Sequence, residues 1–289
     1  MGRVPAFGGM TEQARQRGRY GSVSSLSPNF PNFLLLTRVG FAARGLLYLI
    51  IGYLALQLGQ TQDAGGALEH ISREAGGVVL GALALGFLAY GIWRVADAAF
   101  DTQSKGKDAK GLAGRAAGAV SGLIHLGLAF TAAKLATGGG SGGDSSDSAE
   151  SGAAAAMSLP GGDLLLYAAA AILAVAGAAQ LAVAAKRSFC KHLAAQAKDK
   201  WWVIAAGTGG HAARGIIFLA AAWLVFNATR HHQAEEAGAL GDAMLSLPET
   251  LRAAVAAGLC LFGIYSLIEA RYRIIPEPHV KHRVADALT

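Results

Sequence analysis

The sequence has few charged residues for its length. Asp, Glu, Lys and Arg make up 15% of the 289 residues, whereas a soluble domain usually contains about 25%. Only two cysteines occur. Cys190 falls in a predicted loop and Cys260 in the middle of an apolar segment, so we expect neither a disulfide between them nor a cysteine metal site. The scarcity of charge favours a membrane protein.

Recognisable catalytic motifs are also missing from the sequence. The one Gly-x-Ser-x-Gly match, GGSGG at 139–143, falls in the low-complexity stretch TGGGSGGDSSDS and does not follow a strand, so it lacks the context of a nucleophile elbow. There is no His-Glu-x-x-His helix and no P-loop. The glycine-rich stretch GTGGHAARG, which ends at Gly215, opens an apolar segment and follows no strand, so it lacks the context of a nucleotide-binding loop. We therefore expect no enzyme activity and no cofactor.

Long apolar segments are abundant, and 53% of the residues are hydrophobic. Each segment reaches or approaches the roughly 20 residues that an α-helix needs to cross a bilayer. The sequence therefore predicts an all-α polytopic membrane protein with six transmembrane helices, at about 34–58, 76–97, 116–137, 163–185, 202–228 and 251–270.

The basic residues are distributed unevenly among the segments between the predicted helices. Nineteen Lys and Arg lie in the two tails and in the second and fourth loops, against four in the other three loops, which are acidic. The positive-inside rule then places both termini in the cytoplasm. We expect the basic loops to meet the lipid bilayer at anionic headgroups, and we expect no nucleic-acid partner.

An internal repeat organises the six segments into three helical hairpins. The odd-numbered helices align on Gly45, Gly122 and Gly215, and the even-numbered helices on Gly91, Gly177 and Gly263. Two helices per copy give all copies the same orientation, which predicts a pseudo-threefold axis along the membrane normal. The predicted divisions are a disordered cytoplasmic tail at 1–32, repeats at 33–110, 111–195 and 196–275, and a cytoplasmic tail at 276–289.

Two further expectations concern packing. Each outer loop, such as GGALEHISREAGG, reads as a short amphipathic helix at the membrane surface. The fourth apolar segment, YAAAAILAVAGAAQLAVAA, is so rich in alanine that we expect it to pack tightly against its neighbours.

The AARG openings, the ending GIYSLIEARYR and the stretch FCKHL resemble a bacterial membrane family known as domain of unknown function 1206. The resemblance covers about residues 34–275. It implies a six-helix bacterial membrane protein and no known activity. The second copy departs from the pattern, with Ser121 where the other two have arginine.

Two arginines, Arg44 and Arg214, lie inside apolar segments, where a charge costs about 2.5–3.5 kcal/mol. Repeats 1 and 3 each have such an arginine and also a carboxylate near the end of the second helix, Asp97 and Glu269. Repeat 2 lacks both charges. We therefore predict intramembrane ion pairs Arg44–Asp97 and Arg214–Glu269, with Arg94 or a lipid phosphate as the next candidate partner. An anion site formed by both arginines across the pseudo-axis is the functional alternative.

Three aligned positions, Tyr48, His125 and Phe218, lie close to these arginines on their helices and are candidate cavity-lining residues. His125 is either a proton relay or a hydrogen-bonded packing residue. The run RHHQAEE places His231 and Glu235 at metal-ligand spacing, but it lacks a second cluster, so we predict no metal site.

These patterns favour a non-enzymatic integral membrane protein of the bacterial cytoplasmic membrane with a structural or interaction-based role. The alternative is a small-solute transporter or channel with a cavity on the pseudo-threefold axis. The Pro-x-Asp/Glu-x-x-Lys/Arg signature of mitochondrial carriers is missing from all three odd-numbered helices.

Overall fold

The computed structural model describes residues 30–57, 63–103, 105–139, 145–238 and 240–274. The predicted tail at 276–289, and the tail at 1–32 except its last three residues, lie outside this part. The chain divides into two units, residues 1–35 and 36–289. Residues 30–35, at the start of the first long helix, are the described part of the first unit.

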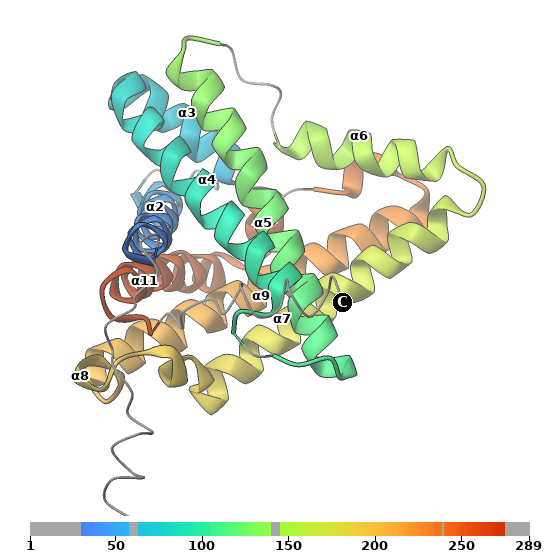
Figure 1. Ribbon diagram of the computed structural model, residues 1–289. Helices are drawn as coiled ribbons and strands as arrows, with labels where there is room; N and C mark the ends of the chain where they lie inside the picture. Colours follow the sequence, from blue (N-terminus) through green and yellow to red (C-terminus); the bar gives the residue numbers. More distant parts are fainter. Residues whose placement is uncertain (1–29, 58–62, 104, 140–144, 239, 275–289) are drawn as a thin grey trace, which may run out of the picture. The chain divides into compact units, whose positions relative to one another are not determined.

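Six long helices, separated by short connections, dominate the described residues (Figure 1). Each is long and apolar enough to cross a bilayer. Within the described part there is no strand, only an isolated bridge between Leu193 and Arg273. The all-α, six-helix prediction is confirmed for α2 (Phe30–Gln57), α4 (Gly76–Phe100), α5 (Ala109–Ala136), α7 (Gly162–Lys186), α9 (Trp201–His231) and α11 (Glu249–Tyr272).

The loops after α2, α5 and α9 each contain a short helix, as predicted. These helices are α3 (Ala64–Glu74), α6 (Ser145–Met157) and α10 (Leu240–Leu245). The carboxylate of Asp63 begins α3 by accepting a hydrogen bond of 2.9 Å from the backbone N–H of Gly66. The buried side of α3, which includes Leu68 and Ile71, joins the apolar core formed by the long helices.

Successive repeats meet through pairs of the aligned glycines. A Cβ built on Gly45 would lie 2.9 Å from the carbonyl oxygen of Gly263, so the backbones of α2 and α11 are in direct contact. The same contact recurs at two other interfaces, Gly122 with Gly91 and Gly215 with Gly177. Each of the six glycines also contacts a branched side chain of the opposite helix, four residues after the glycine with which it pairs. These side chains are Leu49, Val95, Leu126, Leu181, Leu219 and Leu267. These three equivalent interfaces, α2·α11, α5·α4 and α9·α7, establish the pseudo-threefold relation.

The two helices within a repeat also pack closely in repeats 1 and 3. A Cβ on Gly86 would lie 2.4 Å from the Cβ of Ala43, and one on Gly258 would lie 2.5 Å from that of Ala213. Repeat 2 has Ile172 and Val120 at the corresponding positions, and both side chains are exposed. The helices α5 and α7 are not in close contact with each other in the described part, as expected where bulky residues replace the small ones that allow a close approach. In Figure 1 the chain passes from α5 to α7 through α6.

The expectation that the alanine-rich helix α7 packs tightly is wrong. Only 17% of the residues in its most apolar stretch are buried, against 50% in the corresponding stretches of α2 and α11. Its close contact is with α9, through Gly177, and most of its remaining surface faces outward. Small side chains permit close packing, but they do not require it.

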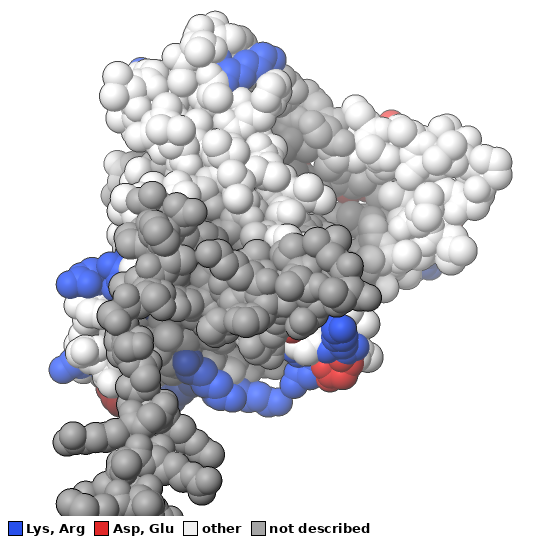
Figure 2. All heavy atoms as spheres, in the orientation of Figure 1, with Lys and Arg blue, Asp and Glu red and all other residues white. Residues whose placement is uncertain are grey.

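The two ends of the helices differ in charge. We call the end with the loops 101–108 and 187–200 the basic end, and the end with α3, α6 and α10 the acidic end. Figure 2 shows most of the visible Lys and Arg toward the lower part of the view, where Figure 1 places α8 (Ala195–Lys198). The prediction that both termini lie in the cytoplasm rests on this difference in charge between the two ends.

Replacing Gly177 by alanine should weaken the α7·α9 interface. The new Cβ would lie 2.8 Å from Leu219 Cγ and 2.9 Å from the carbonyl oxygen of Gly215, so we expect a loss of about 1–3 kcal/mol in the free energy of unfolding. Thermal unfolding in detergent micelles measures it. Gly127→Ala in α5 is the matched control, since open space surrounds Gly127 and alanine is the better helix former. Equal losses in the two variants would contradict the proposed role of the glycine pairs.

Candidate functional site

The most polar region inside the helices is centred on Glu269 of α11, which is 4% exposed. One carboxylate oxygen, Oε2, lies 2.5 Å from Nη2 of Arg44 on α2. The other oxygen, Oε1, pairs with Arg273, one turn further along the chain. Arg273 also donates a 3.0 Å hydrogen bond to the side-chain oxygen of Gln103. The carboxylate therefore joins the first and third repeats through two arginines.

All three nitrogens of the Arg44 guanidinium have partners. Besides the bond to Glu269, Nη1 donates to the hydroxyl of Tyr90 at 2.6 Å and Nε donates to that of Ser266 at 3.2 Å. Gly40 makes the bond to Tyr90 possible, because a Cβ there would lie 2.7 Å from the Cβ of Tyr90. A buried arginine that is paired and hydrogen-bonded in this way avoids most of the penalty of an isolated charge.

Arg44 thus has a different carboxylate from the one predicted. The carboxylate of Asp97 instead lies 2.6 Å from Nζ of Lys105 and also accepts hydrogen bonds from Thr102 and Gln103. The loop after α4 turns back toward Asp97 because the side chain of Asp101 accepts from the backbone N–H groups of Lys105 and Gly106. Arg44 itself faces α11, since the glycine interface places α2 against the third repeat.

Arg214 does not form its predicted pair with Glu269 either. Among the described residues it has no ion pair and no hydrogen bond. Its guanidinium carbon instead lies 4.6 Å from the ring centroid of Phe262, 5.2 Å from that of Phe218 and 5.5 Å from that of Tyr48. These rings belong to α11, α9 and α2, and the residue of α7 that aligns with Glu269 is Val183.

The three candidate cavity-lining residues are half-buried and have different neighbours. The ring of Tyr48 packs edge-on against Phe262 at 4.8 Å, and Phe218 lies under Arg214. His125 lies 4.4 Å from the ring of Tyr90, and its Nδ1 is 2.7 Å from the backbone carbonyl oxygen of Ser121. An Nδ1–H group donating to that carbonyl is typical of a packing histidine. That these side chains line a cavity remains a prediction.

Two polar residues inside the bundle, His211 and Gln180, were not among the predicted site residues. Nδ1 of His211 on α9 lies 2.6 Å from Oε1 of Gln180 on α7, which joins the second and third repeats. The imidazole also stacks on Phe189, with ring centroids 5.4 Å apart. The three-residue spacing between His211 and Arg214 was the available signal, since it places both on one side of a helix.

Two titratable groups outside the membrane-spanning segments have shifted pKa values. Burial raises the pKa of the Cys190 thiol, with a smaller contribution from the charge of Asp199. Burial and the Arg273 guanidinium lower the pKa of His192. A raised thiol pKa means little thiolate at neutral pH, which is the opposite of an activated nucleophile.

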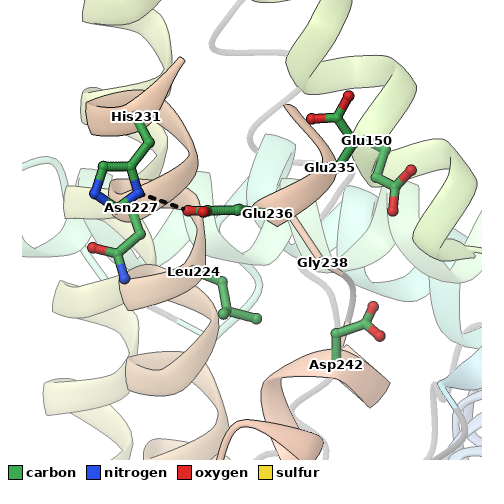
Figure 3. A pocket seen from close by; sticks show the side chains of 8 residues that line it. All are labelled: Glu150, Leu224, Asn227, His231, Glu235, Glu236, Gly238 and Asp242. Atoms are coloured by element: carbon green, nitrogen blue, oxygen red, sulfur yellow. Dashed lines mark hydrogen bonds and ion pairs between the residues drawn. The ribbon is translucent and has the colours of Figure 1, made fainter. Parts of the chain in front are cut away.

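An open pocket of about 430 Å³ lies at the acidic end (Figure 3). His231 pairs there with Glu236 at 3.0 Å, whereas Glu235, which lies at metal-ligand spacing from it in the sequence, lines another side of the pocket. Within the described residues no group of three or more His, Cys, Asp or Glu could hold a metal ion. The lining consists of Glu150, Leu224, Asn227, His231, Glu235, Glu236, Gly238 and Asp242.

Glu269→Gln should be far more destabilising than Asp97→Asn. The first substitution leaves Arg44 and Arg273 without a counter-charge in a buried site, for which we expect a loss of about 3–5 kcal/mol. Asp97 pairs with a partly exposed lysine, so its neutral amide should cost about 1–2 kcal/mol. Equilibrium unfolding of both variants in the same lipid–detergent mixture measures the difference. If Asp97→Asn costs as much as Glu269→Gln, the carboxylate of Glu269 is not the central one.

Comparison with known proteins agrees with this architecture. The sequence profile of a family described as Domain of Unknown Function (DUF1206) matches three segments, residues 39–101, 116–187 and 209–273. Each segment holds the two long helices of one repeat: α2 and α4, α5 and α7, or α9 and α11. The chain is also 26% identical over 249 residues to the "Uncharacterized protein YxxB" of Bacillus subtilis (strain 168), which covers 82% of this chain and 90% of that protein.

No solved structure matches the chain. The three matched segments, in tandem, account for most of the sequence and coincide with the three two-helix repeats that meet through the glycine pairs. The chain is therefore a member of the DUF1206 family.

Proposed function

We propose that this protein is a non-enzymatic integral membrane protein of the bacterial cytoplasmic membrane that works by interaction with other membrane components. Arg44 is the observation that carries the proposal. Its three nitrogens donate to Ser266, Tyr90 and Glu269 inside the bundle, so its charge holds repeats 1 and 3 together. A charge used in this way is not available to a substrate.

The second repeat supports the interaction-based part of the proposal. Its helices α5 and α7 lack the close contact that the other two repeats have, and they leave large apolar side chains exposed. Examples are Val120, Phe130, Ile172 and Val175. Lipid chains or another apolar surface would cover them, because such side chains are unfavourable in water.

The charged loops suggest how the protein is oriented. In the proposed arrangement the basic end faces the cytoplasm, as the positive-inside rule predicts. Lys191, Lys198 and Lys200 of the loop 187–200 are exposed there and would contact anionic lipid headgroups.

Transport of a small solute is the second candidate, and Arg214 is the observation that favours it. Its guanidinium has no carboxylate partner among the described residues, and a free cation inside a membrane protein often marks an ion or substrate path. Against transport, Tyr48 packs on Phe262 and His125 on Tyr90, so these side chains fill space near the proposed axis.

Thiol accessibility separates the two candidates. In a Cys190→Ser, Cys260→Ala background, single cysteines replace Tyr48, His125 or Phe218, and sealed vesicles are treated with a membrane-impermeant maleimide from each side. We expect all three thiols to be protected in the folded protein and to react after unfolding in SDS. Leu159→Cys is the positive control, because Leu159 is exposed at the acidic end. Labelling at all three positions would reveal water near the axis and would make transport the leading function.

A further inference from the structure

The three glycine interfaces carry different polar groups at equivalent positions. At α2·α11 these are Arg44, Ser266 and Glu269; at α5·α4 they are Ser121, Arg94 and Asp97; at α9·α7 they are Arg214, Gln180 and Val183. The first two interfaces each contain one arginine and one carboxylate. The third contains an arginine and no carboxylate.

Nothing else on α7 replaces the missing carboxylate. Gln180, which corresponds to the Ser266 that binds Arg44, has its side-chain oxygen 2.6 Å from His211. Val183 is apolar and packs against the aromatic cluster that contains Phe262. Arg214 is therefore left with the faces of three aromatic rings, which stabilise a cation less than a desolvated counter-charge does.

Unsatisfied polar atoms gather on the same helix. Five buried side-chain nitrogen or oxygen atoms in the described part have no hydrogen-bond partner, and three of them belong to α9. These are Oγ1 of Thr208, Nε2 of His211 and Nε of Arg214. The spacing of three residues places them along one side of α9. Buried polar groups are normally hydrogen-bonded, so this concentration indicates a partner that the chain does not supply.

We propose that Arg214 binds a singly charged oxyanion, a carboxylate or a phosphodiester, which takes the place that the Glu269 carboxylate has beside Arg44. The planar guanidinium presents paired N–H donors that fit the two oxygens of either group. The hydroxyl of Thr208 supplies a further donor on the same side of α9. A free carboxylate and the phosphodiester of an anionic lipid share this chemistry.

The test is thermal unfolding of the full-length protein purified in an uncharged maltoside detergent. The probes are acetate, titrated against chloride at constant ionic strength, and phosphatidylglycerol, titrated against a phosphate-free diacylglycerol. A ligand that binds only the folded state should raise the Tm of the wild-type protein by about 2–4 °C. A response to acetate identifies a free carboxylate as sufficient, and a response to phosphatidylglycerol alone identifies the lipid.

Two substitutions at Val183 make the test specific. Val183→Glu supplies the carboxylate found at the equivalent positions 97 and 269, so it should raise the Tm without added anion and abolish the response to it. Val183→Gln has nearly the same size without the charge and should keep the response. Arg214→Gln should lose it, whereas Arg230→Gln, at an exposed position, should keep it.

Either of two results would overturn the proposal. One is a wild-type Tm that neither probe raises. The other is a response that Val183→Glu and Val183→Gln share equally, which would place the anion elsewhere on the protein. The comparison at position 183 keeps Arg214 in place, so it remains decisive even if Arg214→Gln does not fold.

Discussion

The structure depends on backbone contact between the glycines of successive repeats. Inside a bilayer the apolar side chains gain nothing by leaving lipid for protein, so close packing between helices must hold the bundle together. Because Gly45 touches Gly263 directly, the rotation of α2 about its own axis is fixed within narrow limits. The residue just before the glycine, Arg44, is thereby directed at the helix of another repeat. The glycines thus decide which charges meet.

Much of the fold could be predicted from the sequence. Apolar segments of sufficient length predict the six helices, and alignment of the three copies identifies the six glycines that form the interfaces. The alignment also places Arg44 and Glu269 at the positions that take part in charge pairing. It could not show that the pair joins different repeats, because the first helix of a repeat can pack on the second helix of its own repeat or of another repeat, and a linear comparison does not distinguish the two.

Other features depend on three-dimensional details that the pattern does not contain. Asp97 pairs with Lys105 because the side chain of Asp101 accepts a hydrogen bond from the backbone of Lys105 and so turns the loop back toward α4. The sequence separation alone does not reveal that turn. The alanine content of α7 suggested tight packing, yet α5 and α7 are not in close contact, and repeat 2 has the bulky residues Val120 and Ile172 where the other repeats have a close contact between alanine and glycine. In both cases the outcome depends on contacts in the folded structure and not on the composition of the segment itself.

The ion pair between Arg44 and Glu269 joins residues that are 225 positions apart in the chain. A ribosome that makes this protein from its amino terminus delivers the arginine to the membrane when most of the chain, including its carboxylate partner, has yet to be synthesised. For that interval the cation depends on water, headgroups and, later, Tyr90. Only the arrival of the last helix neutralises it. A chain that stops before α11 therefore carries an uncompensated charge in the bilayer, and electrostatics alone distinguishes it from the finished protein.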